Sequence, residues 1–298
     1  MKRRALLALG GTVLWAAAAS AAKALSSEEL LLSELSLPGD RAFGRALLLV
    51  PRQLPPEPEL LVLLHGLGET HDQNVGARAF AERYGLLTSV ARLAHPPLSR
   101  QSPGPDYFGA GRLEQLNQRL VERPFRMPVM VCPYTPNPYK AGGEALVARY
   151  ADFLVGALKS EVEERVKSRF PASRCMLSGV SLGGYLAIEA FLRKPEHYCA
   201  LGTAQGAFGH NQAARYAGAI AAAEKRVGPR RVEILTSSFD PYRVPNERFH
   251  AQLQKRGLAS RLRTSPGPHD QRWLIESGVI EMLISADEVF AAQRGAAP

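Results

Sequence analysis

Gly179-Val180-Ser181-Leu182-Gly183 stands between two different periodicities of large side chains. Before it, residues 174–178 form a short apolar run of strand length, and after it, the large residues of 184–192 have helical spacing. A serine at the apex of such a strand–turn–helix unit takes a strained backbone conformation that only small neighbours tolerate, which explains the two glycines. The turn exposes the hydroxyl and brings the free N–H groups of the helix start beside it. This pattern predicts a nucleophilic serine, Ser181.

Strand and helix patterns alternate along the rest of the chain. Residues 60–64 are a continuous run of leucine and valine, typical of a strand buried on both faces of a parallel sheet. The other expected strands are 41–50 at an edge, 129–134, 174–178, 198–204, 231–237 and 261–264. The expected helices are 25–37, 73–90, 113–121, 143–169, 184–192, 213–227, 246–257 and 271–292. The alternation predicts one domain with a mostly parallel sheet flanked by helices on both faces.

A serine nucleophile needs a base, and His269 is the predicted one. It lies in the Gly/Pro-rich segment 265–270, between the last expected strand and the last expected helix. Such a turn at the carboxyl end of a strand brings its side chain to the sheet edge on which the serine turn opens. His210 also follows a strand end and is a minor candidate, whereas His197 and His250 fall in or beside expected helices.

The base in turn needs an acid, and Asp240 is the predicted one. It follows the expected strand 231–237 and precedes Pro241, which stops the sheet from continuing. Asp270 is the main rival, but neighbouring side chains in a turn usually diverge. An aspartate directly before Gln271 is also well suited to cap the last helix.

The loop after strand 60–64 reads His65-Gly66-Leu67-Gly68-Glu69. Its glycines allow a backbone N–H to approach the carbonyl oxygen of a substrate, as in an oxyanion loop. The alternative is a plain glycine turn that joins strand to helix. The serine turn downstream favours the first interpretation.

Two further segments are expected near this edge of the sheet. The aromatic loop 134–139 follows a strand and lines a pocket or forms a surface turn. The Pro/Ser/Gly-rich loop 95–106 and the amphipathic stretch 113–121 are expected to form a lid or rim. The sequence does not decide whether they move.

The first residues have the pattern of a signal peptide. Lys-Arg-Arg at 2–4 precedes an apolar run at 5–19 and small residues at 20–24. We therefore expect a signal peptide over 1–24 and an exported catalytic domain over 25–298, in the periplasm or outside the cell. Twin-arginine export and Sec export both fit the paired arginines. The alternative to a cleaved signal peptide is an uncleaved N-terminal anchor.

Composition narrows the class of protein. Of the 298 residues, 46% are hydrophobic and 22% charged, as in an ordinary globular chain. The formal charge of +9 comes partly from residues 2–4, and the remaining arginines are scattered rather than grouped with aromatics. We therefore expect no nucleic acid partner and no stable membrane insertion after cleavage.

The sequence contains three cysteines, Cys132, Cys175 and Cys199, each in an expected apolar strand. Buried free thiols are the simpler interpretation, and a bridge between neighbouring strands remains the alternative for an exported protein. Their spacing does not indicate a metal site, and we expect neither metal nor cofactor.

Three motifs carry a resemblance: HGLG at 65–68, GVSLGGY at 179–185 and GPHDQRW at 267–273. With the order of elements, they resemble the α/β-hydrolase superfamily, and within it the secreted esterases of the esterase D, feruloyl esterase and mycolyltransferase group. The resemblance implies an α/β-hydrolase fold in a single domain. It also implies the functional set Ser181 as nucleophile, Asp240 as acid, His269 as base, and the N–H groups of Leu182 and Leu67 as oxyanion donors.

We further expect Tyr134, Tyr185 and Trp273 to contact substrate. For Trp273 the resemblance is the reason, since a tryptophan near the histidine is frequent in that group. Pro268 departs from the group, in which a glycine often precedes the histidine, and stiffens the turn. The expected function is cleavage of a small-molecule or polymer-borne carboxylic ester through an acyl-enzyme. The alternatives are acyl transfer or peptide cleavage at the same site, or a catalytically silent binding protein.

Overall fold

The computed structural model describes residues 29–37, 40 and 42–295, and the expected signal peptide at 1–24 lies outside them. Its framework is one eight-stranded sheet in the order β1-β2-β4-β3-β5-β6-β7-β8. Strands β3 to β8 are parallel, whereas β1 and β2 are antiparallel to their neighbours. The strands are β1 (Leu30–Ser36), β2 (Arg45–Pro51), β3 (Leu60–Leu64), β4 (Val129–Pro133), β5 (Cys175–Val180), β6 (Ala200–Ala204), β7 (Arg231–Phe239) and β8 (Ser260–Pro268).

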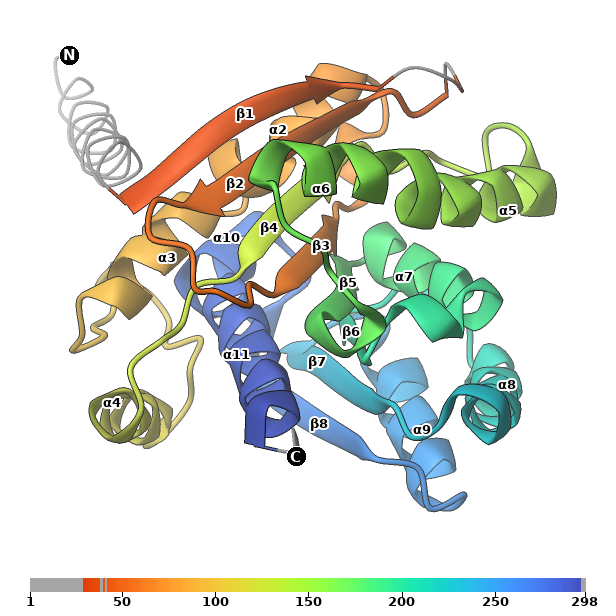
Figure 1. Ribbon diagram of the computed structural model, residues 1–298. Helices are drawn as coiled ribbons and strands as arrows, with labels where there is room; N and C mark the ends of the chain where they lie inside the picture. Colours follow the sequence, from red (N-terminus) through yellow and green to blue (C-terminus); the bar gives the residue numbers. More distant parts are fainter. Residues whose placement is uncertain (1–28, 38–39, 41, 296–298) are drawn as a thin grey trace, which may run out of the picture.

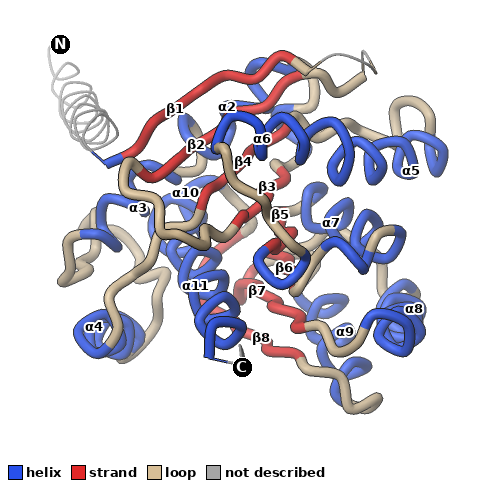
Figure 2. Tube along the Cα trace, viewed as in Figure 1, coloured by secondary structure: helices blue, strands red, loops and turns tan. Residues whose placement is uncertain are grey.

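Helices cover both faces of this sheet, as predicted. In Figure 1 the strands follow one another from β1 at the top to β8 at the bottom, with α3, α4 and α11 on the left and α5, α7, α8 and α9 on the right. Figure 2 shows the same layers. The helices are α2 (Gln73–Glu82), α3 (Leu86–Ala94), α4 (Arg112–Glu122), α5 (Gly143–Phe153), α6 (Lys159–Val166), α7 (Leu182–Arg193), α8 (Gln212–Val227), α9 (Arg243–Gln254), α10 (Gln271–Trp273) and α11 (Val279–Gly295). The π-helical turns 154–158 and 274–278 join α5 to α6 and α10 to α11.

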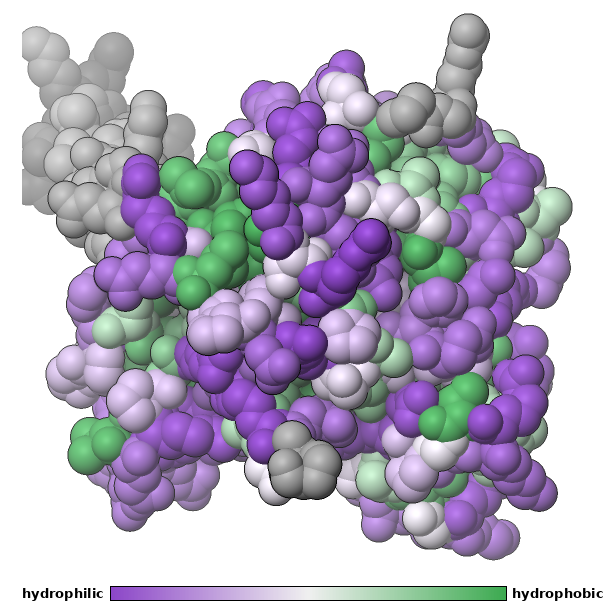
Figure 3. All heavy atoms as spheres, in the orientation of Figure 1, coloured by the Kyte–Doolittle hydropathy of each residue, from purple (hydrophilic) through white to green (hydrophobic). Residues whose placement is uncertain are grey.

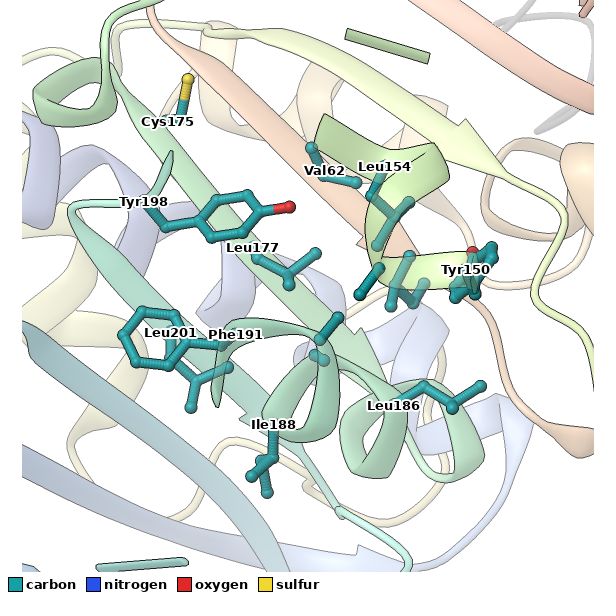
Figure 4. Close-up of a cluster of buried hydrophobic side chains, with 14 of the residues drawn as sticks. Val62, Tyr150, Leu154, Cys175, Leu177, Leu186, Ile188, Phe191, Tyr198 and Leu201 are labelled. Carbon is teal, nitrogen blue, oxygen red and sulfur yellow. The ribbon is translucent and has the colours of Figure 1, made fainter. Parts of the chain in front are cut away.

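Each face of the sheet has its own apolar core. Successive strand residues alternate between them: Leu177 packs with α5 to α9, and Met176 packs with α2, α3, α4 and α11. Figure 4 shows Leu177 and Val62 of the sheet among helix side chains such as Leu186. Burial on both faces explains why the central strands are apolar throughout rather than alternating.

The first element differs from the prediction. Residues 30–36, expected within a helix at 25–37, form strand β1, which pairs antiparallel with all of β2. Leucines in so short a run fit helical and strand spacing equally, so periodicity alone could not decide. The open edge of β2 supplies hydrogen-bonding partners, and Leu30 and Leu35 are buried. Strand β2 is therefore second from the edge rather than the edge itself.

Two helix predictions were too long. The expected helix 73–90 is divided into α2 and α3 at Gly85, whose φ of 76° is left-handed. A side chain on Gly85 would also lie 3.2 Å from the backbone of Ile275. The expected helix 143–169 ends at Val166, because Lys167 adopts a left-handed φ of 54°.

Most apolar side chains lie in these two cores, and the surface is correspondingly polar (Figure 3). The face in Figure 3 is mostly hydrophilic, and apolar side chains show there only in separate patches. Within 29–295, apart from residues 38, 39 and 41, no helix combines the length and apolar character needed to cross a membrane.

The cysteines follow the simpler prediction. Cys132, Cys175 and Cys199 are all buried and free. The thiol of Cys199 donates a hydrogen bond to the carbonyl of Cys175 on the neighbouring strand, at 3.1 Å. The alternative of a bridge between strands is not found.

Candidate active site

Ser181 occupies the turn between β5 and α7, as its motif predicted. Its backbone has φ 54° and ψ −117°, a region that a residue with a side chain rarely adopts. Its N–H donates to the carbonyl of Ala204 at the end of β6, at 2.9 Å, which holds the turn against the neighbouring strand. The structure thus stores backbone strain at this serine.

The flanking glycines are required by close backbone contacts. A side-chain carbon built on Gly183 would lie 2.1 Å from the carbonyl oxygen of Leu64, and one on Gly179 would lie 2.3 Å from that of Gly183. Both distances are far inside van der Waals contact. The helix therefore approaches β5 and β3 as closely as it does only because these positions carry no side chain.

Ser181, His269 and Asp240 form one hydrogen-bonded series. Nε2 of His269 lies 2.9 Å from Oγ of Ser181, and Nδ1 lies 2.9 Å from Oδ1 of Asp240. An ionised carboxylate can only accept, so Nδ1 carries the proton and Nε2 is free to accept from the serine hydroxyl. The ring of Tyr242 packs edge-on against the imidazole, with 5.6 Å between ring centres.

Asp240 is buried, and both of its carboxylate oxygens accept hydrogen bonds. Its side chain is 0% exposed. Besides the imidazole it accepts from the hydroxyl of Thr236 at 2.7 Å and from the N–H of Tyr242 at 2.9 Å. These donors stabilise the charged carboxylate without water. Asp240 directly follows the parallel strand β7, the position on which its prediction as the acid rests.

The rival residues lie elsewhere. Asp270 accepts from the N–H of Trp273 at 2.9 Å and caps α10, the role expected for it. His210 is exposed on the loop before α8. Of the described residues, no group of three or more His, Cys, Asp or Glu is arranged to hold a metal ion.

The two proposed oxyanion donors each begin a helical segment beside Ser181. Leu182 is the first residue of α7, and Leu67 is the first residue of a 3₁₀ turn, Leu67–Glu69. The first N–H of a helical segment has no acceptor within that segment. A side chain built on Gly66 would lie 3.6 Å from Cβ of Ser181, so the loop that carries Leu67 runs directly beside the serine.

His65 orients that loop, a role that the sequence analysis missed. Its Nε2 accepts from the backbone N–H of Thr135 at 2.8 Å, so Nδ1 carries the proton and donates to the carbonyl of Gly66, also at 2.8 Å. That carbonyl and the Leu67 N–H belong to one trans peptide unit and point in opposite directions. Because the carbonyl is held on the buried His65, the N–H is directed away from it. A histidine between a buried strand and a glycine is the only local signal of this role.

Burial makes His65 a source of pH-dependent stability. Removal from water lowers its pKa from 6.5 to about 4, although the bond to Gly66 acts in the opposite sense. The unfolded chain therefore binds this proton more readily than the folded one. The stabilisation is complete above pH 6.5 and is lost as the pH falls towards 4, an expected decrease of about 3 kcal/mol in the free energy of unfolding.

Urea unfolding of the wild type and of His65→Gln, measured from pH 7 to pH 4, tests this expectation. His197 and His250 also have pKa values lowered by burial, but they are present in both proteins. The difference between the two pH profiles therefore isolates His65. Parallel profiles would show that His65 is not the group that titrates.

The three aromatic residues expected at the substrate differ in position. Tyr185 is half-buried one turn after Ser181, and its ring stacks on that of Tyr139, which is 70% exposed. Tyr134 is buried, donates to the carbonyl of Thr70 at 2.7 Å and lies against His65. Of the three predicted residues, Tyr185 therefore offers ring surface to a ligand, together with its partner Tyr139.

Trp273 requires a correction. Its side chain is 1% exposed, and its indole N–H donates to the hydroxyl of Ser265 at 2.7 Å. A side chain built on Gly267 would lie 2.7 Å from this indole. Trp273 therefore packs in the core against the segment that carries His269, instead of facing substrate. Its short distance from His269 in sequence did not reveal that α10 directs it into the core.

Residues 107–109 form a rim beside the histidine segment. A side chain built on Gly267 would lie 2.6 Å from the ring of Tyr107, and one on Gly109 would lie 3.2 Å from Pro266. These residues, which lie between the loop 95–106 and the stretch 113–121, thus pack directly on the turn that carries His269.

Helix α4, expected to belong to the rim, is anchored to α11. Arg112 binds the carboxylate of Glu281 through two nitrogens, at 2.6 and 2.8 Å. Arg119 pairs with the fully buried Asp287. Removing one partner of such a buried pair is strongly destabilising, so α4 is held firmly to this layer.

Solved structures share this architecture. A ferulic acid esterase matches with a TM-score of 0.60 at 14% identity, over 88% of this chain and 98% of its own. The S-formylglutathione hydrolase FrmB from Staphylococcus aureus matches with 0.54 at 14% identity, over 86% and 96%. The enterobactin esterase FES from Shigella flexneri matches with 0.55 at 16% identity, over 87% and 59%. No family model and no curated protein sequence matches the chain.

Proposed function

We propose that this chain, which has the α/β-hydrolase fold, is a serine hydrolase that cleaves carboxylic esters. The observation that carries the proposal is the series Ser181, His269 and Asp240, in which a hydroxyl, an imidazole and a buried carboxylate follow one another at 2.9 Å. The strained backbone of Ser181 and the two N–H groups beside it support the same chemistry. Similarity to proteins named as esterases agrees with it.

Acylation begins at the serine. Nε2 of His269 takes the hydroxyl proton while Oγ of Ser181 attacks the ester carbonyl carbon, and the carbonyl electron pair moves to oxygen. The N–H groups of Leu67 and Leu182 stabilise this oxyanion, and Asp240 stabilises the imidazolium. When the carbonyl re-forms, the bond to the alcohol oxygen breaks, and the imidazolium gives its proton to the departing alcohol.

Deacylation repeats the sequence with water. His269 takes a proton from the attacking water, a second oxyanion forms, and the bond to Ser181 Oγ breaks as the imidazolium returns its proton to the serine. The carboxylic acid leaves, and the enzyme is regenerated. No group besides the side chains and backbone described above takes part in the steps proposed here.

A fluorophosphonate probe tests the proposal on the full chain. We expect one covalent adduct, located by mass spectrometry on the peptide that contains Ser181, together with hydrolysis of p-nitrophenyl esters of increasing acyl length. Product transferred to an added alcohol in preference to water would favour acyl transfer instead, and cleavage of amides alone would favour a peptidase. Folded protein that forms no adduct and cleaves no ester would favour a binding protein.

A further inference from the structure

Two of the three strained non-glycine residues in the described part of the chain are neighbours in space. Positive φ values occur at Lys167, Ser181 and Gln205, the last with φ 49°. Lys167 ends a helix, where this conformation is ordinary. Gln205 follows β6 directly after Ala204, the residue that accepts the Ser181 N–H. Strain at a residue with a side chain indicates that the surroundings hold it there.

The side chain of Gln205 reaches the segment that carries His269. It is 1% exposed, and its amide nitrogen donates to the carbonyl of Pro268 at 2.9 Å and to the hydroxyl of Ser237 at 2.7 Å. The Ser237 hydroxyl donates to the same Pro268 carbonyl at 3.2 Å. Two side-chain donors thus hold the peptide bond that leads into His269.

This support replaces hydrogen bonds that the strand itself cannot make. Pro266 and Pro268 have no N–H to donate, and the pairing of β7 with β8 is shifted before Pro268. The intervening N–H of Gly267 donates to a side chain, the hydroxyl of Ser238, at 3.3 Å. The end of β8 therefore depends on side-chain hydrogen bonds for its position.

We infer that Gln205 is a positioning residue that sets the distance between His269 and Ser181. Its backbone is joined to the serine turn through the Ala204 carbonyl, and its amide holds the carbonyl before His269. The inference rests on the proposed function, since it concerns the proton transfer between these two groups. Displacements of about 1 Å in such a pair cost on the order of 100-fold in rate.

A glycine at position 205 distinguishes an effect on the position of His269 from an effect on folding. Gln205→Gly removes the amide but adopts a positive φ without strain, so part of the lost stability is recovered. We expect kcat for p-nitrophenyl acetate to fall about 10- to 100-fold, with KM within about twofold, because the variant loses alignment rather than substrate contacts. Gln205→Glu keeps the length of the side chain but directs a carboxylate oxygen at the Pro268 carbonyl, and we expect at least the same loss.

Lys167→Gly is the matched control. It relieves the same kind of strain at a helix end with no contact to the triad, so we expect an unchanged kcat. A readout without substrate completes the test: the low-field proton NMR signal of His269 Nδ1–H, expected in the wild type, should weaken or disappear in both Gln205 variants. If Gln205→Gly does not fold, Gln205→Glu provides the same comparison.

The outcomes distinguish this inference from the proposed function. A wild type that cleaves no ester and forms no adduct contradicts the proposed function, and the NMR comparison then decides on Gln205 alone. Folded Gln205 variants with wild-type kcat, or with an unchanged Nδ1 signal, overturn the positioning role. A change in KM alone would also overturn it, because positioning of the base acts on kcat.

Discussion

Ser181→Ala is expected to form no fluorophosphonate adduct and to lose ester hydrolysis by about 10⁴-fold or more. In the proposed mechanism the hydroxyl oxygen attacks the ester, and its proton leaves through the 2.9 Å contact with His269. The loss should appear in kcat, since the proposed oxyanion donors, the N–H groups of Leu67 and Leu182, are unchanged in this variant. Any residual rate reports what these donors contribute alone.

The control for this variant comes from the same strand. Ser178 lies three residues earlier in β5 and is buried, but its hydroxyl faces Gly202 and not the triad. Ser178→Ala should therefore keep the adduct and the rate, while its stability reports the sensitivity of this strand to a lost hydroxyl. An adduct that persists in Ser181→Ala would assign the nucleophile to another residue.

The principal site residues could be predicted because they depend on the topology of the sheet. Parallel strands bring their carboxyl ends to one edge, so a residue placed just after a strand is placed in space as well. Ser181, Asp240 and His269 each satisfy this rule, and the structure brings all three within hydrogen-bonding distance. The same rule located the loop of Leu67.

Residues whose role depends on distant partners could not be predicted. His65 is fixed by Thr135, and Gln205 by Pro268, and no local pattern connects either pair. The prediction that Trp273 contacts substrate was wrong for a related reason. Proximity to His269 in sequence does not say on which side of the turn the indole ring packs. The sequence pattern predicts a helix where β1 forms, because the partner of β1, the open edge of β2, is visible only in three dimensions.

Asp240→Asn is the second variant with a large expected effect, a decrease in kcat of up to about 10⁴-fold. The carboxylate is 0% exposed, so in the variant water cannot reach this position to stabilise the imidazole ring when it becomes positive in the transition state. An asparagine that turns its amide nitrogen to Nδ1 would also force the proton onto Nε2. That tautomer cannot accept the serine proton, so either orientation impairs the base.

Asp270→Asn is the matched comparison, since it makes the same chemical change one residue after the histidine. Asparagine caps a helix about as well as aspartate, so α10 should remain and kcat should stay within about twofold. Steady-state kinetics of the two variants with one ester decide which carboxylate stabilises the imidazolium. A larger loss in Asp270→Asn than in Asp240→Asn would mean that the acid is misassigned. The opposite result would show that a buried charge at the end of β7, and not merely one near the histidine, activates the base.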